Sequence, residues 1–242
     1  MALYLYRGLW TGVDWLYPPR CAGCEKQGVR LCHDCVQTIQ KLEPPYCLLC
    51  ADPIDTGEIC QKCINHPPKY DFLRSWAVFG GPLRQALHRL KYRRDLGLGD
   101  VLAHQMVQCL NSQDWKIDVV VPVPLGRARQ KERGYNQAAL LARPLAWECA
   151  LAYRPKAIRR VKETRSQVGL SLEGRRENTH NAFVAQRELV SEQNVLIVDD
   201  VATTGATLDA CAQALRAAGA QQVYAITLAR ALRRADNTYA DS

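Results

Sequence analysis

A short apolar segment that is followed directly by two acidic residues limits the choice of fold most. Residues 195–198 read VLIV, and this run of mostly β-branched residues predicts a strand that is buried on both faces. Asp199 and Asp200 end the run, and an alanine-rich helix is expected from about residue 208 to residue 218. The loop between them carries hydroxyl side chains and a glycine, at Thr203, Thr204, Gly205 and Thr207.

This succession of strand, acids, loop and helix is typical of a ligand site. The loop can direct backbone N–H groups and threonine hydroxyls toward a phosphate, and the N-terminus of the helix adds a partial positive charge. Helix capping is the simpler interpretation, but capping requires only one such polar residue. Two adjacent acids at the carboxyl end of a buried strand lie where open α/β sheets bind ligands, which favours a phosphate site.

The other apolar segments predict an α/β protein. Further strands are expected at residues 72–79, 117–123 and 223–228, and they alternate with helices expected at residues 82–92, 98–110 and 137–150. This alternation predicts a largely parallel sheet flanked by helices. The chain has 242 residues, of which 48% are hydrophobic and 23% are charged, so it can form one large core and a small additional module.

Eight of the eleven cysteines form four C-x-x-C pairs near the N-terminus. The pairs are Cys21/Cys24, Cys32/Cys35, Cys47/Cys50 and Cys60/Cys63. Each such turn places two sulfur atoms on one side of a metal ion, so the spacing predicts two structural zinc ions. Iron–sulfur ligation and a disulfide framework are the alternatives, although disulfides are typical of secreted chains. We expect sequential pairing, the first pair with the second and the third with the fourth; an interleaved cross-brace is the other arrangement.

The first residues predict an amphipathic helix, and a proline pair marks a domain boundary. One face of the helix is expected to pack on the body of the protein through Leu5, Leu9, Val13 and Leu16. Binding of this helix to a membrane surface is the alternative. The segment His66-Pro67-Pro68 disfavours helix. The expected domains are therefore residues 1–68, with the helix and the cysteine pairs, and residues 69–242.

The positive charge of the chain is concentrated in one segment. The formal net charge is +8, and Lys and Arg outnumber Asp and Glu mainly between Arg127 and Arg176. Such a concentration indicates an anionic partner, either a polyphosphate substrate or nucleic acid. Residues 162–178 are polar and show no apolar periodicity, which predicts a mobile loop or lid over a site.

Several motifs give the chain a resemblance to a known family. Residues 195–207, VLIVDDVATTGAT, resemble the loop that binds phosphoribosyl pyrophosphate (PRPP) in type I phosphoribosyltransferases. With the cysteine pairs and four further motifs, the chain resembles the ComF family of competence-associated, phosphoribosyltransferase-like proteins. These motifs are Lys91-Tyr92, PVPL at 122–125, RGYNQ at 133–137 and the stretch from Thr164 to Phe183. The resemblance implies a type I phosphoribosyltransferase-like sheet preceded by a small double zinc ribbon.

The resemblance also implies roles for individual residues. Asp199 and Asp200 would be the catalytic acids that hold the ribose 2′- and 3′-hydroxyls. The 5′-phosphate would be bound by Ala202, Thr203, Thr204, Gly205, Ala206 and Thr207. Mg²⁺ would accompany PRPP, and its pyrophosphate would be contacted by Arg127, Lys131 and Arg133 and by Arg165, Arg175 and Arg176 of the expected lid. Thr203 stands where purine-salvage enzymes have an acidic general base, and a hydroxyl cannot replace that base near pH 7, which argues against purine salvage.

Members of the ComF family are linked to the uptake or use of external DNA, which implies a cytoplasmic protein. The expected function is that of a PRPP-binding phosphoribosyltransferase-like protein in this process. The alternative is a non-catalytic adaptor that binds single-stranded DNA or a nucleotide on the same fold. A PRPP-sensing regulator is a third possibility. The implied partners are PRPP or a related phosphorylated sugar, single-stranded DNA and other DNA-uptake proteins.

Overall fold

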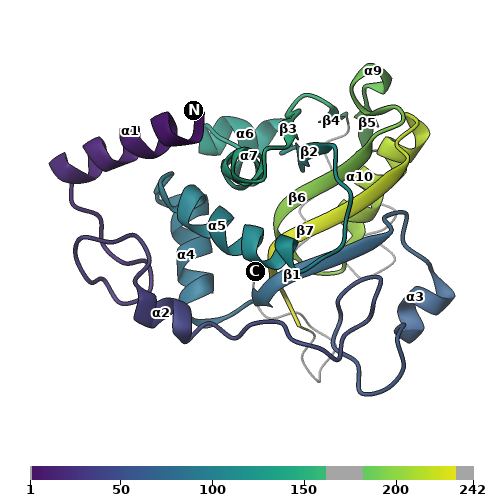
Figure 1. Cartoon of the computed structure of the whole chain (residues 1–242), viewed down its shortest axis with the longest axis horizontal. Helices are drawn as coiled ribbons and strands as arrows, with labels where there is room; N and C mark the ends of the chain where they lie inside the picture. The colour runs from purple at the N-terminus through teal and green to yellow at the C-terminus, as the bar shows by residue number, and fades with distance from the viewer. Residues whose placement is uncertain (1, 162–181, 233–242) are drawn as a thin grey trace.

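A five-stranded parallel sheet forms the centre of the protein. The computed structural model describes residues 2–161 and 182–232. The strands are β1 (Phe72–Val78), β2 (Val119–Pro122), β3 (Ala152–Tyr153), β6 (Asn194–Ala202) and β7 (Gln222–Arg230), in the spatial order β1-β7-β6-β2-β3 (Figure 1). All neighbouring strands of this sheet are parallel. The predicted α/β class with a parallel sheet is thus confirmed.

Helices cover both faces of the sheet, and β6 contributes to both buried layers. On one face, α4 (Gly81–Tyr92), α5 (Leu98–Asn111) and α7 (Gln137–Glu148) share a hydrophobic cluster with Leu196 and Val198. On the other face, α10 (Ala206–Ala217) shares a second cluster with Val195 and Ile197. Successive residues of a strand point to opposite faces, so the VLIV run is buried on both sides, as its composition predicts.

The order of strands and helices gives the sheet a switch point between β2 and β6, the place where doubly wound sheets form a ligand crevice. Strands β2 and β6 are neighbours, but α7 follows β2 on one face and α10 follows β6 on the other. Doubly wound sheets bind ligands outside the carboxyl ends of two such strands. Shorter elements complete the fold: α6 (Arg127–Arg133), α9 (Arg187–Val190) and an antiparallel pair of β4 (Ile158–Arg160) with β5 (Phe183–Ala185).

Strand β6 is longer than the sequence predicts. It continues to Ala202, so Asp199 and Asp200 lie inside the strand and do not end it. The reason is its neighbour β7, which stays paired with β6 as far as Arg230, opposite Ala202, without a break in register. The hydrogen bonds of this ladder hold the two acidic residues extended despite their low strand propensity.

The N-terminal helix α1 (Ala2–Leu16) forms as predicted, but the prediction of its inner face is wrong. Leu5, Leu9 and Leu16 are 69%, 65% and 65% exposed. The helix docks through its other side, where Arg7 forms ion pairs with Asp100 and Glu148 at 3.0 and 2.6 Å. Tyr6 also packs edge-to-face on Trp147 of α7, so these polar and aromatic contacts, and not the leucine periodicity, hold the helix in place. In the described part of the chain no helix has the length and apolar character needed to cross a membrane.

Two cysteine-rich modules lie between α1 and β1 in the sequence. The first zinc module spans Cys21–Cys35 and includes the start of α2 (His33–Gln37); the second spans Cys47–Cys63 and includes the start of α3 (Gln61–Asn65). The two short helices lie well apart along the horizontal long axis of Figure 1. The first module packs on α4, where Arg89 donates to the Cys21 carbonyl at 3.2 Å. The second packs on β1, where the Leu73 N–H donates to the Leu49 carbonyl at 2.8 Å.

Candidate phosphate site and metal centres

The loop after β6 has the geometry of an anion-binding turn. It connects β6 to α10 through Thr203, Thr204 and Gly205, and we call residues 202–207 the phosphate loop. Gly205 has a φ of +79°, and a Cβ there would lie 3.1 Å from the Tyr70 hydroxyl, so glycine is favoured at this position. The N–H groups of the first turn of α10 have no carbonyl four residues earlier within the helix. Together with the helix dipole, they can bind a phosphate at this end.

The two aspartates leave β6 on opposite faces, because they are successive residues of an extended strand. Asp200 is 5% exposed and lies on the α4 side, whereas Asp199 is half-buried and lies on the α10 side. Each carboxylate accepts a hydrogen bond from the following backbone N–H: Asp199 from Asp200 at 2.9 Å, and Asp200 from Val201 at 3.0 Å. Their Cβ atoms thus lie on opposite faces of β6, but the two carboxyl groups share a side-chain hydrogen bond near the carboxyl end of the strand, which raises the pKa of Asp199 and lowers that of Asp200.

Lys91, near the end of α4, forms an ion pair with the buried aspartate. Its Nζ atom lies 2.8 Å from Oδ2 of Asp200. Burial is the largest single effect and raises the pKa of Asp200, but the Lys91 ammonium, a hydrogen bond with Asp199 and the charge of Arg133 together lower the pKa below its ordinary value. Burial raises the pKa of Asp199 well above its ordinary value, and the Asp200 carboxylate adds to this effect. The Lys91 ammonium thus favours the charged form of Asp200.

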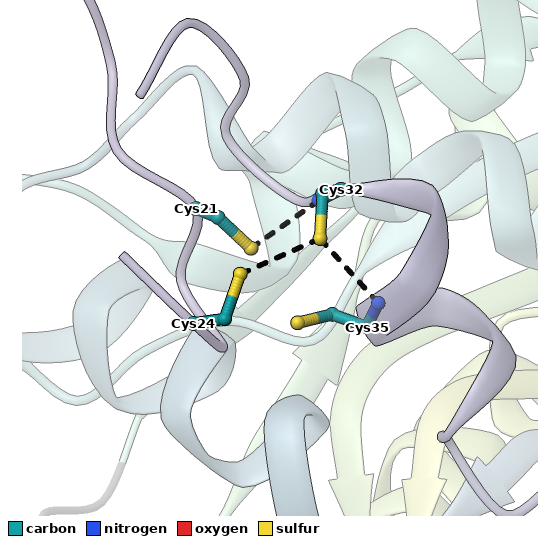
Figure 2. A group of neighbouring side chains, drawn as sticks. All are labelled: Cys21, Cys24, Cys32 and Cys35. Carbon is teal, nitrogen blue, oxygen red and sulfur yellow. Dashed lines mark hydrogen bonds between the residues drawn. The ribbon is translucent and has the colours of Figure 1, made fainter. Parts of the chain in front are cut away.

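The eight paired cysteines form two separate clusters. Cys21, Cys24, Cys32 and Cys35 make the first, and their side chains point toward one another in Figure 2. Cys47, Cys50, Cys60 and Cys63 make the second. Within each cluster the sulfur atoms lie within 4.8 Å of one another. The predicted sequential pairing is confirmed, and the cross-brace is excluded.

The geometry and chemistry of both clusters fit zinc. Cys24 and Cys32 sulfurs are 3.6 Å apart, and those of Cys50 and Cys60 are 3.7 Å apart. A tetrahedral Zn–S bond of about 2.3 Å requires a separation of about 3.8 Å. Burial opposes ionisation of the Cys21 thiol, but backbone N–H groups, that of Cys32 foremost, lower its pKa to about 6. A thiolate is the form of cysteine that binds metal, and four cysteine ligands with no open position are typical of a structural zinc centre.

Sequence comparisons identify the families of the cysteine-rich N-terminal part and of the part that contains the sheet. Residues 12–64 match the family model of a double zinc ribbon domain, and residues 92–241 match that of a phosphoribosyl transferase domain. Competence protein F of Haemophilus influenzae is 32% identical over 88% of this chain and 97% of its own length. The DNA utilization protein YhgH of Salmonella typhimurium is 33% identical over 88% and 89%, respectively. The chain belongs to the ComF family.

A more distant ComF relative, Competence protein ComFC of Bacillus subtilis, is 27% identical over 85% of this chain and 86% of its own length. Among solved structures, an allosteric regulatory enzyme of purine biosynthesis is 18% identical over 60% of this chain and 30% of its own length, with a TM-score of 0.40. The family assignment therefore rests on the sequence matches, which cover 88% of this chain and 97% of Competence protein F.

The RGYNQ motif of this ComF protein ties α4 to the end of β2. Tyr135 donates its hydroxyl to the Leu90 carbonyl at 2.6 Å, directly before Lys91. Asn136 donates to the Val123 carbonyl at 2.9 Å and accepts from the Ala138 N–H, which caps α7. Gly134 ends α6 with a φ of +79°, the left-handed conformation that favours glycine. The motif thus fixes the position of Lys91 relative to the crevice.

The arginine of this motif stacks on Tyr92. The Arg133 guanidinium lies 4.9 Å from the Tyr92 ring centroid and donates to Gln137 at 3.0 Å. Its Nε atom is buried and has no hydrogen-bond partner in the described structure. The positive charge of Arg133 also helps to lower the pKa of Asp200. Arg133 is therefore the predicted cation that the structure brings to the acid pair.

The other predicted cations are placed differently. Arg127 and Lys131 lie exposed on α6, a helix that the sequence analysis missed because its residues are nearly all polar. Arg165, Arg175 and Arg176 lie outside the described residues, as does the expected lid at residues 162–178. No role at the acid pair was predicted for Lys91. The signal that could have found it is the Lys91-Tyr92 motif itself, in which Lys91 is the first residue.

Proposed function

We propose that this protein binds PRPP, or a closely related phosphorylated sugar, and acts as a phosphoribosyltransferase-like protein in the use of external DNA, in the cytoplasm. One observation carries the proposal: the buried Lys91–Asp200 ion pair lies at the carboxyl end of β6, beside an anion-binding turn. A buried charged pair at a sheet crevice is typical of a functional site. The names of the ComF relatives, competence and DNA utilization, support the biological setting.

Different residues of the site bind different parts of the ligand. The phosphate loop binds the 5′-phosphate through its N–H groups. The carboxylates of Asp199 and Asp200, on either side of the end of β6, accept hydrogen bonds from the ribose hydroxyls. Lys91, which lies beside Asp200, would contact the pyrophosphate, and Mg²⁺ that accompanies PRPP would offset the remaining charge. In a transfer reaction the bond from ribose carbon 1 to the pyrophosphate oxygen would break, pyrophosphate would leave with the electron pair, and a nucleophilic atom of the acceptor would form the new bond to carbon 1.

Calorimetric titration of PRPP with Mg²⁺ into the zinc-loaded protein tests the proposal. Asp200→Asn removes the charge that the ribose hydroxyls and Lys91 share, and affinity is expected to fall by about a hundredfold, which equals about 2.8 kcal/mol. Asp114→Asn, at an exposed position before β2, is the matched control and should bind like the unaltered protein. Absence of binding by the unaltered protein, or equal binding by Asp200→Asn, would reject the proposal.

Lys91 offers a second test of the same site. Lys91→Met removes the cation from the pyrophosphate side and leaves Asp200 buried without its counter-charge. PRPP affinity is expected to fall by about tenfold or more, because a charge-assisted contact contributes about 1.5–3 kcal/mol. Ribose 5-phosphate, which lacks the pyrophosphate, should lose much less affinity in the same variant. Lys116→Met, an exposed lysine before β2, is the control. An equal loss for both ligands would contradict the role of Lys91.

An adaptor for single-stranded DNA is the second candidate. It is favoured by the exposed cations of α6 and by Arg93 and Arg94 next to α4. Such binding is expected to weaken steeply with salt, by a logarithmic slope of roughly −0.7 for each phosphate that a cation neutralises. Fluorescence anisotropy with a labelled oligonucleotide measures this slope. The adaptor is supported if Asp200→Asn leaves it unchanged and PRPP does not compete, and it is excluded if no salt-dependent binding is found.

A further inference from the structure

The second zinc module lies directly against the phosphate loop. Lys62, between two cysteines of this module, donates from Nζ to the Thr204 carbonyl at 2.6 Å. The Lys69 N–H, just after the module, donates to the Asp209 carboxylate in the first turn of α10. The two parts enclose a small cavity, whose lining includes Lys62, Cys63, Tyr70, Thr204 and Gly205. A lysine on a metal-bound module thus contacts the loop that is proposed to hold the ligand phosphate.

The contact with Thr204 determines which way one N–H group of the loop points. A peptide unit is planar and trans, so its carbonyl and its N–H point in opposite directions. The Thr204 carbonyl and the Gly205 N–H belong to one such unit. While Lys62 holds this carbonyl, the Gly205 N–H must point away from the zinc module. Without the ammonium, the peptide unit could turn and present the carbonyl oxygen, which repels an anion, to the ligand.

The module that carries Lys62 is anchored independently of this contact. Asp52 pairs with the fully buried Arg230 at the end of β7, where the Arg230 Nε to Asp52 Oδ1 distance is 2.8 Å. The Leu49 carbonyl accepts from the Leu73 N–H of β1. Lys62 is therefore held on a rigid support and can fix the loop. The first zinc module packs on α4 instead, so a substitution in that module serves as the control for effects on the phosphate loop.

We propose that Lys62 is a positioning residue that keeps the phosphate loop in its anion-binding conformation, and that it couples the second zinc centre to ligand affinity. The inference rests on the proposed function for its ligand, but the positioning role has a readout that needs no ligand. By linkage, the coupling is reciprocal: if the zinc-bound module favours the phosphosugar, the phosphosugar stabilises zinc in that module by the same factor.

The first experiment compares Lys62→Ala, Lys62→Arg and Lys26→Ala, the last a lysine of the first module. Each variant is first shown to retain two zinc ions. Lys62→Ala should bind PRPP about tenfold more weakly, within the usual range of coupling between sites, whereas Lys62→Arg should restore most of the affinity. Lys26→Ala should bind normally. Unchanged affinity of Lys62→Ala overturns the proposal, whereas failure of the unaltered protein to bind PRPP overturns only the proposed function.

Hydrogen exchange tests the positioning role without ligand. Backbone amides of residues 203–207 should exchange faster in Lys62→Ala than in the unaltered protein and Lys26→Ala, while those of β6 should not change. Equal exchange in the loop would overturn the proposal even if the protein binds no PRPP.

Zinc release tests the reciprocal effect. A chelator is added with and without saturating PRPP, and a Cys47→Ser variant, which keeps only the first centre, identifies the two release phases. PRPP should slow release from the second centre severalfold and leave the first unchanged. Equal protection of both centres, or of neither, would contradict the coupling.

Discussion

Serine in place of Cys32 is expected to leave the protein with one zinc ion and to lower its Tm by on the order of 10 °C. Structural zinc contributes an apparent binding free energy of about 10–16 kcal/mol in small metal-dependent domains, which is as large as the whole stability of many folds. Cys32 belongs to the buried cluster that joins the first zinc module to α4, so loss of zinc also removes apolar packing. Thermal unfolding and metal analysis of the same samples measure both effects.

The remaining cysteines provide the control. Cys109 lies in α5, outside both metal-binding cysteine clusters. Cys109→Ser should keep two zinc ions and change Tm by only a few degrees. If Cys32→Ser still bound two zinc ions, or melted like Cys109→Ser, then the first cluster would not be a structural zinc centre.

Asp52→Ala is expected to lower the free energy of unfolding by about 3 kcal/mol. Arg230 is 0% exposed, and Asp52 accepts from its Nε atom at 2.8 Å. Removal of one partner of a buried ion pair leaves an uncompensated charge, which costs about 3–5 kcal/mol. The lower end applies because the Asp52 side chain is itself 25% exposed. Urea unfolding followed by circular dichroism gives the value.

Asp55→Ala is the matched control, because Asp55 is exposed in the same module. Its effect should stay within about 0.5 kcal/mol. The double variant Asp52→Ala with Arg230→Met should recover part of the lost stability, because an apolar side chain of similar length can occupy the buried position without a counter-charge. A double variant less stable than Asp52→Ala alone would show that Arg230 contributes through packing and not through this pair.

The parts of the fold that were predictable from sequence are those set by local patterns. The VLIV run and the spacing of the cysteine pairs determine a buried strand and two metal clusters almost without reference to the rest of the chain. Long-range contacts decided the rest. The pairing of β6 with β7 extends the strand through Asp199 and Asp200, and ion pairs of Arg7 select the docked face of α1.

The loop of the candidate site could be predicted from the sequence, but the side-chain contacts that Lys91 and Lys62 make at the site could not. The phosphate loop follows from one contiguous segment. The Lys91–Asp200 pair joins residues 109 positions apart, and the Lys62–Thr204 contact joins residues 142 positions apart. No periodicity in the sequence reports on such pairs. Exposed polar helices such as α6 also show no apolar periodicity. The cations of α6 were therefore predicted as candidate site residues, but the helix that carries them was not predicted.

The pairing of β1 with β7 has a consequence for the order of assembly. β1 begins at residue 72, and its first residue lies opposite Tyr224 of β7. During synthesis, β1 and both metal-binding modules leave the ribosome well before the strand that completes their side of the sheet. Both modules and β1 are therefore complete on a growing chain that still lacks β7, and a chain that stops before residue 222 would leave the second module without Arg230, the buried partner of Asp52.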